Sequence, residues 1–117
     1  MPQLISSPSR IPVPGGKVID EYVGRVTTGS TGASVAHMTA PGGWEEPAQT
    51  PEFDEVTLVL RGTVRVEHDV GTLEIHAGQA VLARAGERVR YTTPEEAEYV
   101  AVCLPAFAPE LVHREGE

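Results

Sequence analysis

The sequence predicts a single all-β domain, a barrel or sandwich of short strands. Twelve glycines and ten prolines are spread along all 117 residues, so they separate short segments and do not form a low-complexity linker. Between them, segments rich in Val and Thr recur about every 8 to 12 residues, a spacing typical of all-β sandwiches and barrels. The sequence has no internal repeat of the length found in solenoid proteins.

Each predicted strand is bounded by residues that favour turns. The predicted strands are residues 17–26, 33–39, 53–60, 63–68, 72–76, 80–84, 88–93 and 98–104. The first begins after Gly15-Gly16, the second ends at Pro41-Gly42-Gly43, and the third ends at Gly62. The fourth and fifth flank Asp69-Val70-Gly71, which predicts a hairpin. Gly and Pro residues separate the last three strands and end the series at Pro105.

The two ends of the chain differ from this pattern. Residues 109–115 predict a short helical turn, because Pro109 begins the segment and basic residues end it. Residues 1–16 carry four prolines and predict an N-terminal arm ahead of a barrel domain at residues 17–117. We expect this arm to reach across to a second subunit.

Composition and charge narrow the function classes. The net charge of −8 would repel a phosphate backbone, so nucleic acid is not an expected partner. No apolar stretch approaches the length of a membrane helix, and the N-terminus lacks the pattern of a signal peptide. Cys103 is the only cysteine, which excludes an internal disulfide and indicates a reducing compartment. We expect a cytoplasmic domain whose ligand is a small molecule.

Alternation along residues 53–60 assigns two faces to this strand. One face carries Phe53, Glu55, Thr57 and Val59, and the other carries Asp54, Val56, Leu58 and Leu60. Neither face is uniformly polar, so we expect both to be covered. One would face the interior, and the other would lie against a terminal strand or a second copy of the chain, which predicts a homodimer.

Two glycine-containing spacings resemble the signature blocks of the cupin superfamily. They are Glu55-x6-Gly62, with Gly42 ahead of it, and Gly78-x7-Gly86. The resemblance implies a double-stranded β-helix, or jelly-roll, barrel that is commonly dimeric. The cupin histidines fall on Ala48, Thr50 and Val89, so that Glu55 is the one usual metal ligand retained.

Three segments are similar to the cupin domain of ethanolamine-utilisation proteins, a histidine-poor group. They are residues 53–62, 77–80 and 103–106. The resemblance implies membership of the same subgroup, which is linked to ethanolamine breakdown in bacterial microcompartments. Those proteins carry a long segment ahead of the cupin domain that this chain lacks.

The acidic stretch at residues 45–55 supplies the candidate site. We expect a polar pocket at the barrel mouth in which Glu55 points inward and serves as ligand or general acid/base, the candidate catalytic residue. Glu46, Gln49 and Glu55 are the candidate ligands of one divalent metal ion, because oxygen donors suit such cations. A pocket without metal is the equal alternative. Glu45 is expected, with the remaining acids, on a solvated loop.

Two conditions limit this site. The carboxylate of Glu55 is costly to bury without a partner of opposite charge, and we expect Arg88 or Arg90 to be that partner. The pair would either belong to the functional site or be a purely structural ion pair. Glu46 and Gln49 would face opposite sides of a regular strand. Both reach the pocket only if the prolines around them hold an irregular loop.

His37, Trp44, Phe53 and Tyr91 complete the expected ligand pocket. His37 faces the barrel interior either as a site residue or as a hydrogen-bonded core histidine. Trp44 lies over the pocket or covers the barrel end, and Tyr91 shares a strand face with Val89. Cys103 is expected to be buried and unreactive. The sequence thus favours a small cupin that binds or converts a small polar metabolite around Glu55. The alternative is a sensor or structural cupin without catalysis.

Overall fold

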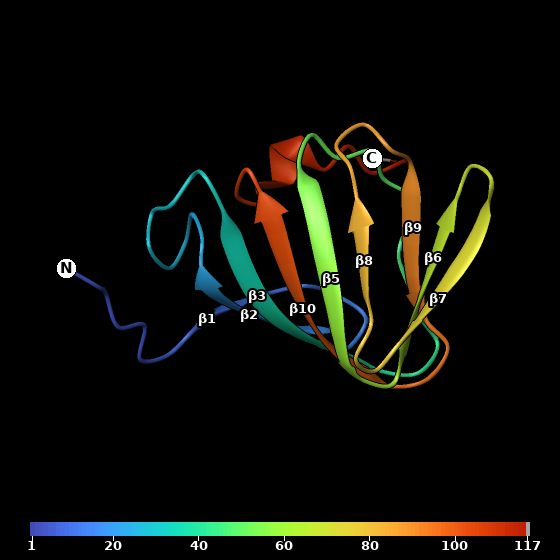
Figure 1. Cartoon of the computed structure of the whole chain (residues 1–117), viewed down its shortest axis with the longest axis horizontal. Coiled ribbons are helices and arrows are strands. Elements are labelled where there is room, and N and C mark those ends of the chain that lie inside the picture. The colour runs from blue at the N-terminus through green and yellow to red at the C-terminus, as the bar shows by residue number, and fades with distance from the viewer. Residues whose placement is uncertain (117) are drawn as a thin grey trace.

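The computed structural model describes residues 1–116 and confirms the all-β prediction (Figure 1). The strands are β1 (Ser9–Ile11), β2 (Val18–Val23), β3 (Ser34–Ala40), β4 (Trp44–Glu45), β5 (Asp54–Arg61), β6 (Thr63–His68), β7 (Gly71–His76), β8 (Ala80–Ala83), β9 (Val89–Thr93) and β10 (Ala97–Leu104). One 3-10 turn, η1 (Pro109–Leu111), lies within the stretch expected to be helical. The predicted hairpin is formed by β6 and β7.

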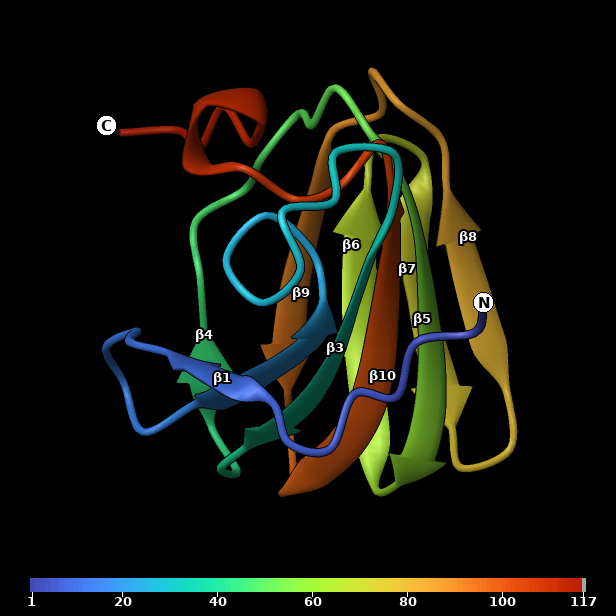
Figure 2. The same ribbon diagram turned by 90° about the vertical axis from the view of Figure 1, so that its left-hand side faces the viewer.

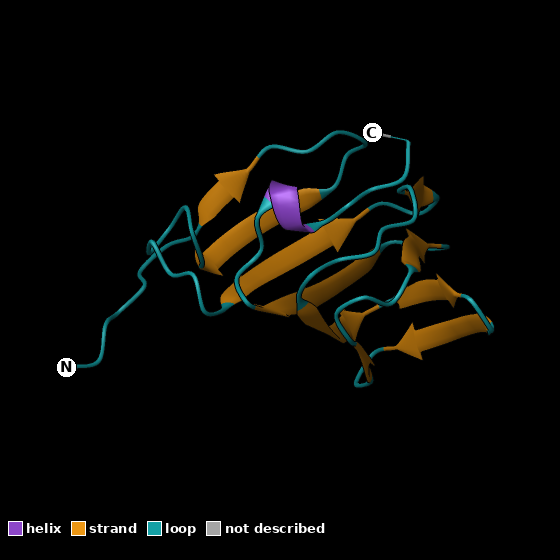
Figure 3. Ribbon diagram, turned by 90° about the horizontal axis from the view of Figure 1, so that it is seen from above, coloured by secondary structure: helices purple, strands orange, loops and turns teal. Residues whose placement is uncertain are grey.

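The strands form two antiparallel sheets that face each other as a jelly-roll sandwich (Figures 1 and 3). The larger sheet has the order β1-β2-β3-β10-β5-β8, and the smaller sheet has the order β4-β9-β6-β7. The central strand of the larger sheet, β10, pairs with β3 on one side and with β5 on the other. No helix in residues 1–116 is long and apolar enough to cross a membrane.

Two short strands were not predicted. β1 lies inside the proline-rich arm and pairs with β2 of its own chain, where the Arg10 guanidinium contacts the Asp20 carboxylate at 2.6 Å. β4 has two residues and pairs with β9. Such short segments carry no alternation that sequence reading can detect. The residues before β1 project away from the sandwich (Figures 1 and 3), and in Figure 2, which looks onto that side, they pass in front of β10 and β5. The contact with a second subunit stays a prediction.

The side-chain alternation predicted for β5 is confirmed. Phe53, Thr57 and Val59 are almost fully buried between the sheets, whereas Leu58 and Leu60 are more than two-fifths exposed on the outer face. The neighbouring strands add further exposed leucines to this outer face, Leu82 and Leu104. The expectation that a second copy covers the face stays a prediction.

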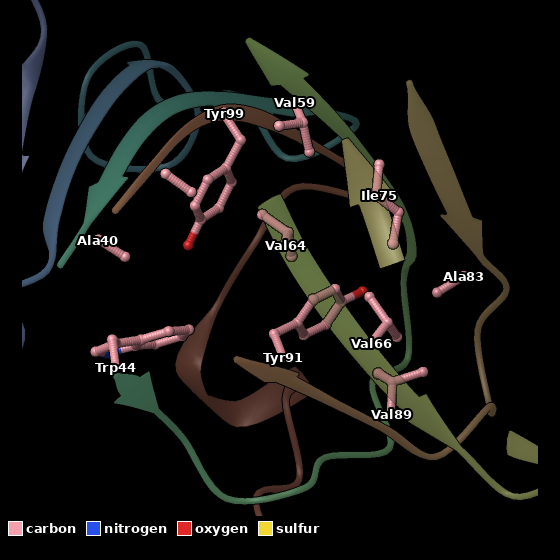
Figure 4. Close-up of a cluster of buried hydrophobic side chains, with 11 residues drawn as sticks. Ala40, Trp44, Val59, Val64, Val66, Ile75, Ala83, Val89, Tyr91 and Tyr99 are labelled. Atoms are coloured by element: carbon pink, nitrogen blue, oxygen red, sulfur yellow. The ribbon is translucent and has the colours of Figure 1, made fainter. Parts of the chain in front are cut away.

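Two buried clusters fill the space between the sheets. The larger one contains Ala40, Trp44, Val59, Val64, Val66, Ile75, Ala83, Val89, Tyr91, Ala97 and Tyr99 (Figure 4). The smaller one joins Phe53 and Cys103 to Val112, beside η1. Side chains from both clusters line one cavity, so the cavity lies where the two clusters meet.

Candidate functional site

The cavity between the sheets has a volume of about 250 Å³. This is slightly below the usual range of pockets for drug-sized ligands, so it suits a small metabolite. Its walls come from the segment around β1, from β2, β3, β5, β9 and β10, from the loop after β4, and from the C-terminal segment. Its ionisable or amide-bearing lining residues are Lys17, Glu21, Glu46, Gln49, Glu55, Tyr91, Tyr99, Cys103 and Arg114.

Glu55 lies on the inward face of β5, between Phe53 and Thr57, and is the predicted centre of the site. Its side chain keeps some accessible surface because it borders the cavity, but protein surrounds it on all other sides. Burial raises its pKa to about 7, an effect that the positive charge of Lys17 partly opposes. Near neutral pH this carboxyl can therefore both donate and accept a proton.

Lys17, directly before β2, is the cation that faces Glu55. Its ammonium lies 4.2 Å from the ring centroid of Trp44 and 5.6 Å from that of Tyr99, within cation–π range. Burial lowers its pKa, while the charges of Glu46 and Glu55 oppose this shift. Within residues 1–116 the ammonium has no carboxylate at ion-pair distance.

The prediction that Arg88 or Arg90 pairs with Glu55 is wrong. Arg88 binds the carboxylate of Glu115, and Arg90 binds those of Glu67 and Glu45. The reason is the alternation of β9, in which Val89 and Tyr91 point inward and the arginines therefore point outward. Lys17 takes the place that was assigned to them.

Glu46 and Gln49 both line the cavity, and the loop that carries them is irregular, as this requires. Gln49 forms an isolated bridge to Val89, with both backbone N–H···O contacts at 2.8–2.9 Å, and a second bridge to Arg114. Burial raises the pKa of Glu46, while Lys17 and Arg114 lower it. The Arg114 guanidinium is 4.0 Å from the Glu46 carboxylate.

Within residues 1–116, three buried polar atoms of lining residues have no well-formed hydrogen bond, although the Tyr91 hydroxyl lies close to the Glu55 carboxyl. They are the Tyr91 hydroxyl, Arg114 Nε and Gln49 Oε1. Most buried polar atoms in folded proteins are paired, so three unpaired atoms around one cavity call for an explanation. A bound molecule that supplies acceptors and donors would provide it.

The expected pocket residues divide into two groups. Phe53 and Tyr91 line the cavity, whereas His37 and Trp44 do not. His37 faces outward because Ala36 and Ala40 occupy the inward face of β3, and its Nε2 lies 2.6 Å from the Glu98 carboxylate. This corrects the prediction of an inward histidine.

Trp44 belongs to the buried core (Figure 4). The face of its ring contacts the Lys17 ammonium. Cys103 is buried as expected, and burial raises the pKa of its thiol.

Sequence reading missed Lys17, Tyr99 and Arg114. The first had a detectable signal, because Lys17, Ile19 and Glu21 alternate along one face. Arg114 had none, since its position depends on contacts between distant segments. The C-terminal segment is held by Thr50 N–H donating to His113 O and by Glu115 N–H donating to Ala48 O. These contacts dock residues 113–115 against the loop after β4.

The predicted metal ligands do not fit a resident divalent ion. Within the part of the chain described here, no group of three or more His, Cys, Asp or Glu side chains could hold a metal. Beside Glu46 and Glu55, the expected set offers only the amide of Gln49, and Lys17 and Arg114 place positive charges next to these carboxyl groups. The chemistry of this donor set favours hydrogen bonding and proton exchange.

Comparison with known families supports the fold. The profile of a family described as AraC-binding-like domain matches residues 22–116. The chain is also 48% identical over 107 residues to a Myxococcus xanthus protein named endoribonuclease YbeY. This match covers 90% of the chain but 36% of the relative, so the chain spans about a third of that protein's length.

Solved structures with this fold have low sequence identity to the chain. Oxalate decarboxylase from Bacillus subtilis has a TM-score of 0.77 and 17% identity, with 95% of this chain and 31% of that chain covered. An RmlC-like cupin from Shewanella frigidimarina has a TM-score of 0.73 and 13% identity, with 89% of both chains covered. A putative ethanolamine utilisation protein, EutQ, from Salmonella typhimurium has a TM-score of 0.63 and 22% identity, with 78% and 71% covered. These likenesses show the cupin fold alone.

Proposed function

Because the chain belongs to the family of AraC-binding-like domains, which here has the cupin fold, we propose that it binds a small polar metabolite in the cavity around Glu55. The main support for this proposal is a set of polar groups on the cavity wall that lack a hydrogen-bond or ion-pair partner within residues 1–116. A carboxyl and an ammonium both border the cavity without a direct ion pair, and three further polar atoms lack partners.

Such a wall is costly to maintain without an occupant. Buried polar groups without hydrogen bonds destabilise a folded protein by about 1–3 kcal/mol each. Lys17 and Arg114 place two positive charges beside the carboxyl groups of Glu46 and Glu55 on the cavity wall. A polar molecule in the cavity would satisfy several of these groups at once, which favours ligand binding over a purely structural role.

We also propose that the cavity works without a resident metal. Lys17 and Arg114 supply positive charge beside Glu46 and Glu55, and other residues stand at the positions of the usual histidine ligands. The function that fits best is therefore recognition of a metabolite, as in a sensor or carrier, with Glu55 as a group that can gain or lose a proton.

The names of the relatives do not extend this proposal. RNA cleavage is named for a protein of which this chain spans about a third, and the net charge of −8 does not favour RNA binding. A role in ethanolamine utilisation rests on a resemblance that the comparisons support at the level of the fold.

Replacement of Ala101 by leucine is expected to abolish ligand binding and to preserve the fold. Ala101 is buried on β10 and lines the cavity, so the larger side chain occupies ligand space. Ala85→Leu, at an exposed turn, is the matched control. The measurement is a screen of metabolites by shift in Tm on the wild type and both variants. We expect at least one compound that raises the Tm of the wild type and of Ala85→Leu.

The same compound should leave the Tm of Ala101→Leu unchanged. Circular dichroism on each variant confirms that the fold is intact. If active compounds shifted all three proteins equally, binding would lie outside the cavity and the proposal would fail. If no compound shifted the wild type, the ligand-binding role itself would lose its support.

A further inference from the structure

We infer that the ligand is a small amphipathic carboxylate whose acid group contacts Lys17, Tyr91 and Arg114, with its hydrocarbon part on the apolar wall. This inference rests on the proposed binding function and names its ligand class. It follows from the kind of hydrogen-bonding atom that lacks a partner, from the charges nearby, and from the rest of the lining.

The atoms without partners are mainly donors. The Tyr91 hydroxyl and Arg114 Nε–H are both buried and both unpaired, and the Lys17 ammonium adds further N–H donors. A carboxylate offers two oxygens with several lone pairs and forms charge-assisted bonds with such donors. An ammonium ligand would only donate, so it could meet Tyr91 only at the hydroxyl oxygen and would leave Arg114 Nε–H unsatisfied.

Gln49 Oε1 is the one acceptor among the three unpaired atoms. It suits a donor on the same molecule, such as a hydroxyl group. The assignment to a carboxylate does not depend on it, because Arg114 Nε–H can only donate and the Tyr91 hydroxyl can donate as well.

The charges around Glu55 favour the same class. The groups that face it are Lys17 before β2, Glu46 from the loop after β4, Tyr91 on β9 and Cys103 on β10, with Arg114 completing the wall. Glu21 on β2 also lines the cavity, and its carboxylate accepts from the backbone N–H and the hydroxyl of Thr27. When Glu55 holds a proton, the positive charges of Lys17 and Arg114 balance the negative charges of Glu46 and Glu21. Protonated Glu55 then no longer repels an anion and is one more donor.

The rest of the lining is apolar. Phe53, Phe107 and Val112 come from the smaller core cluster, and Ile19 and Met38 come from β2 and β3. A wholly polar anion such as phosphate or oxalate would not cover this apolar part of the wall. A carboxylate with a short hydrocarbon chain covers both parts of the wall.

The test is calorimetric titration of the full chain with hexanoate, hexanamide and hexylamine at pH 6. We expect hexanoate to bind at least tenfold more tightly than the other two. Its affinity should fall as the pH rises through about 7, because Glu55 then acquires a charge of the same sign. Tyr91→Phe and Arg114→Gln should each weaken hexanoate binding about tenfold, the loss expected for one hydrogen bond to a charged group.

Arg84→Gln is the control, since Arg84 is exposed and lies outside the cavity. Tyr91→Phe removes one oxygen atom and keeps the ring in the core, so it tests the contact even if Arg114→Gln does not fold. Equal binding of the three probes, tighter binding of hexylamine or absence of hexanoate binding would each overturn the carboxylate assignment. The broader proposal fails separately, through the metabolite screen with Ala101→Leu.

Discussion

Replacement of Glu55 by glutamine is expected to stabilise the protein above pH 7 by about 3 kcal/mol. Burial raises the pKa of the Glu55 carboxyl from its ordinary 4.5 to about 7, which means that the folded state disfavours the charged form. Glutamine has nearly the same shape and carries no charge to desolvate. The positive charge of Lys17 opposes part of the effect of burial, and the pKa of about 7 is the balance of the two.

The direction of the pH dependence follows from the same shift. Between pH 4.5 and about 7 the folded state binds more protons at Glu55 than the unfolded state does. The contribution of this group to stability is therefore fully present below pH 4.5 and is lost as the pH rises through about 7. Glu55→Gln lacks this contribution at every pH.

Urea unfolding at about pH 4.5 and at about pH 8 measures the effect. The free energy of unfolding of the wild type should fall relative to that of Glu55→Gln over this range. Glu45→Gln, at an exposed residue of the preceding segment, controls for the loss of a carboxylate as such. Parallel pH dependences of the wild type and Glu55→Gln would show that Glu55 does not have a raised pKa.

Gly62→Ala is expected to destabilise the protein by about 3 kcal/mol. Gly62 joins β5 to β6 with a φ of +78°, a conformation that residues with a Cβ rarely adopt. A Cβ at this position would lie 2.1 Å from the backbone oxygen of Glu96 and 2.9 Å from the Cα of Ala97. Neither atom can move without displacing the start of β10, the central strand of the larger sheet.

Gly86→Ala is the matched control for this substitution. Gly86 has a φ of +87°, but a Cβ there would meet no atom within 4 Å. The control therefore carries the backbone strain without the clash and should cost about 1 kcal/mol. The measurement is urea unfolding of both variants. Equal losses of stability would show that the close approach of Gly62 to Glu96 and Ala97 does not contribute to the cost of the substitution.

Local patterns in the sequence were sufficient for much of the fold. Alternation in β5 predicted that Phe53, Thr57 and Val59 are buried and that Leu58 and Leu60 lie outside, because the period of two is a property of the strand itself. The same alternation predicted that Glu55 faces inward. The irregular loop that brings Glu46 and Gln49 together was recognised as a condition of the site.

The remaining errors concern contacts between distant segments. His37 lies on a strand with two mixed faces, so alternation alone could not decide which face is the inner one. The sequence pattern made Arg90 an expected partner of Glu55, but its place on β9 turns the side chain outward. Lys17 reaches the cavity instead, from directly before β2 in the larger sheet. Arg114 reaches the cavity only through the docking of the C-terminal segment against the loop after β4.

The most direct test of the central claim, a ligand cavity balanced by Lys17 in place of a metal, is the metal content of the untagged protein. The measurement is elemental analysis for Mn, Fe, Co, Ni, Cu and Zn per chain, on the wild type and on Glu55→Ala. We predict far less than one metal per chain in both proteins. About one metal per chain in the wild type, lost in Glu55→Ala, would contradict the account and restore Glu46, Gln49 and Glu55 as metal ligands.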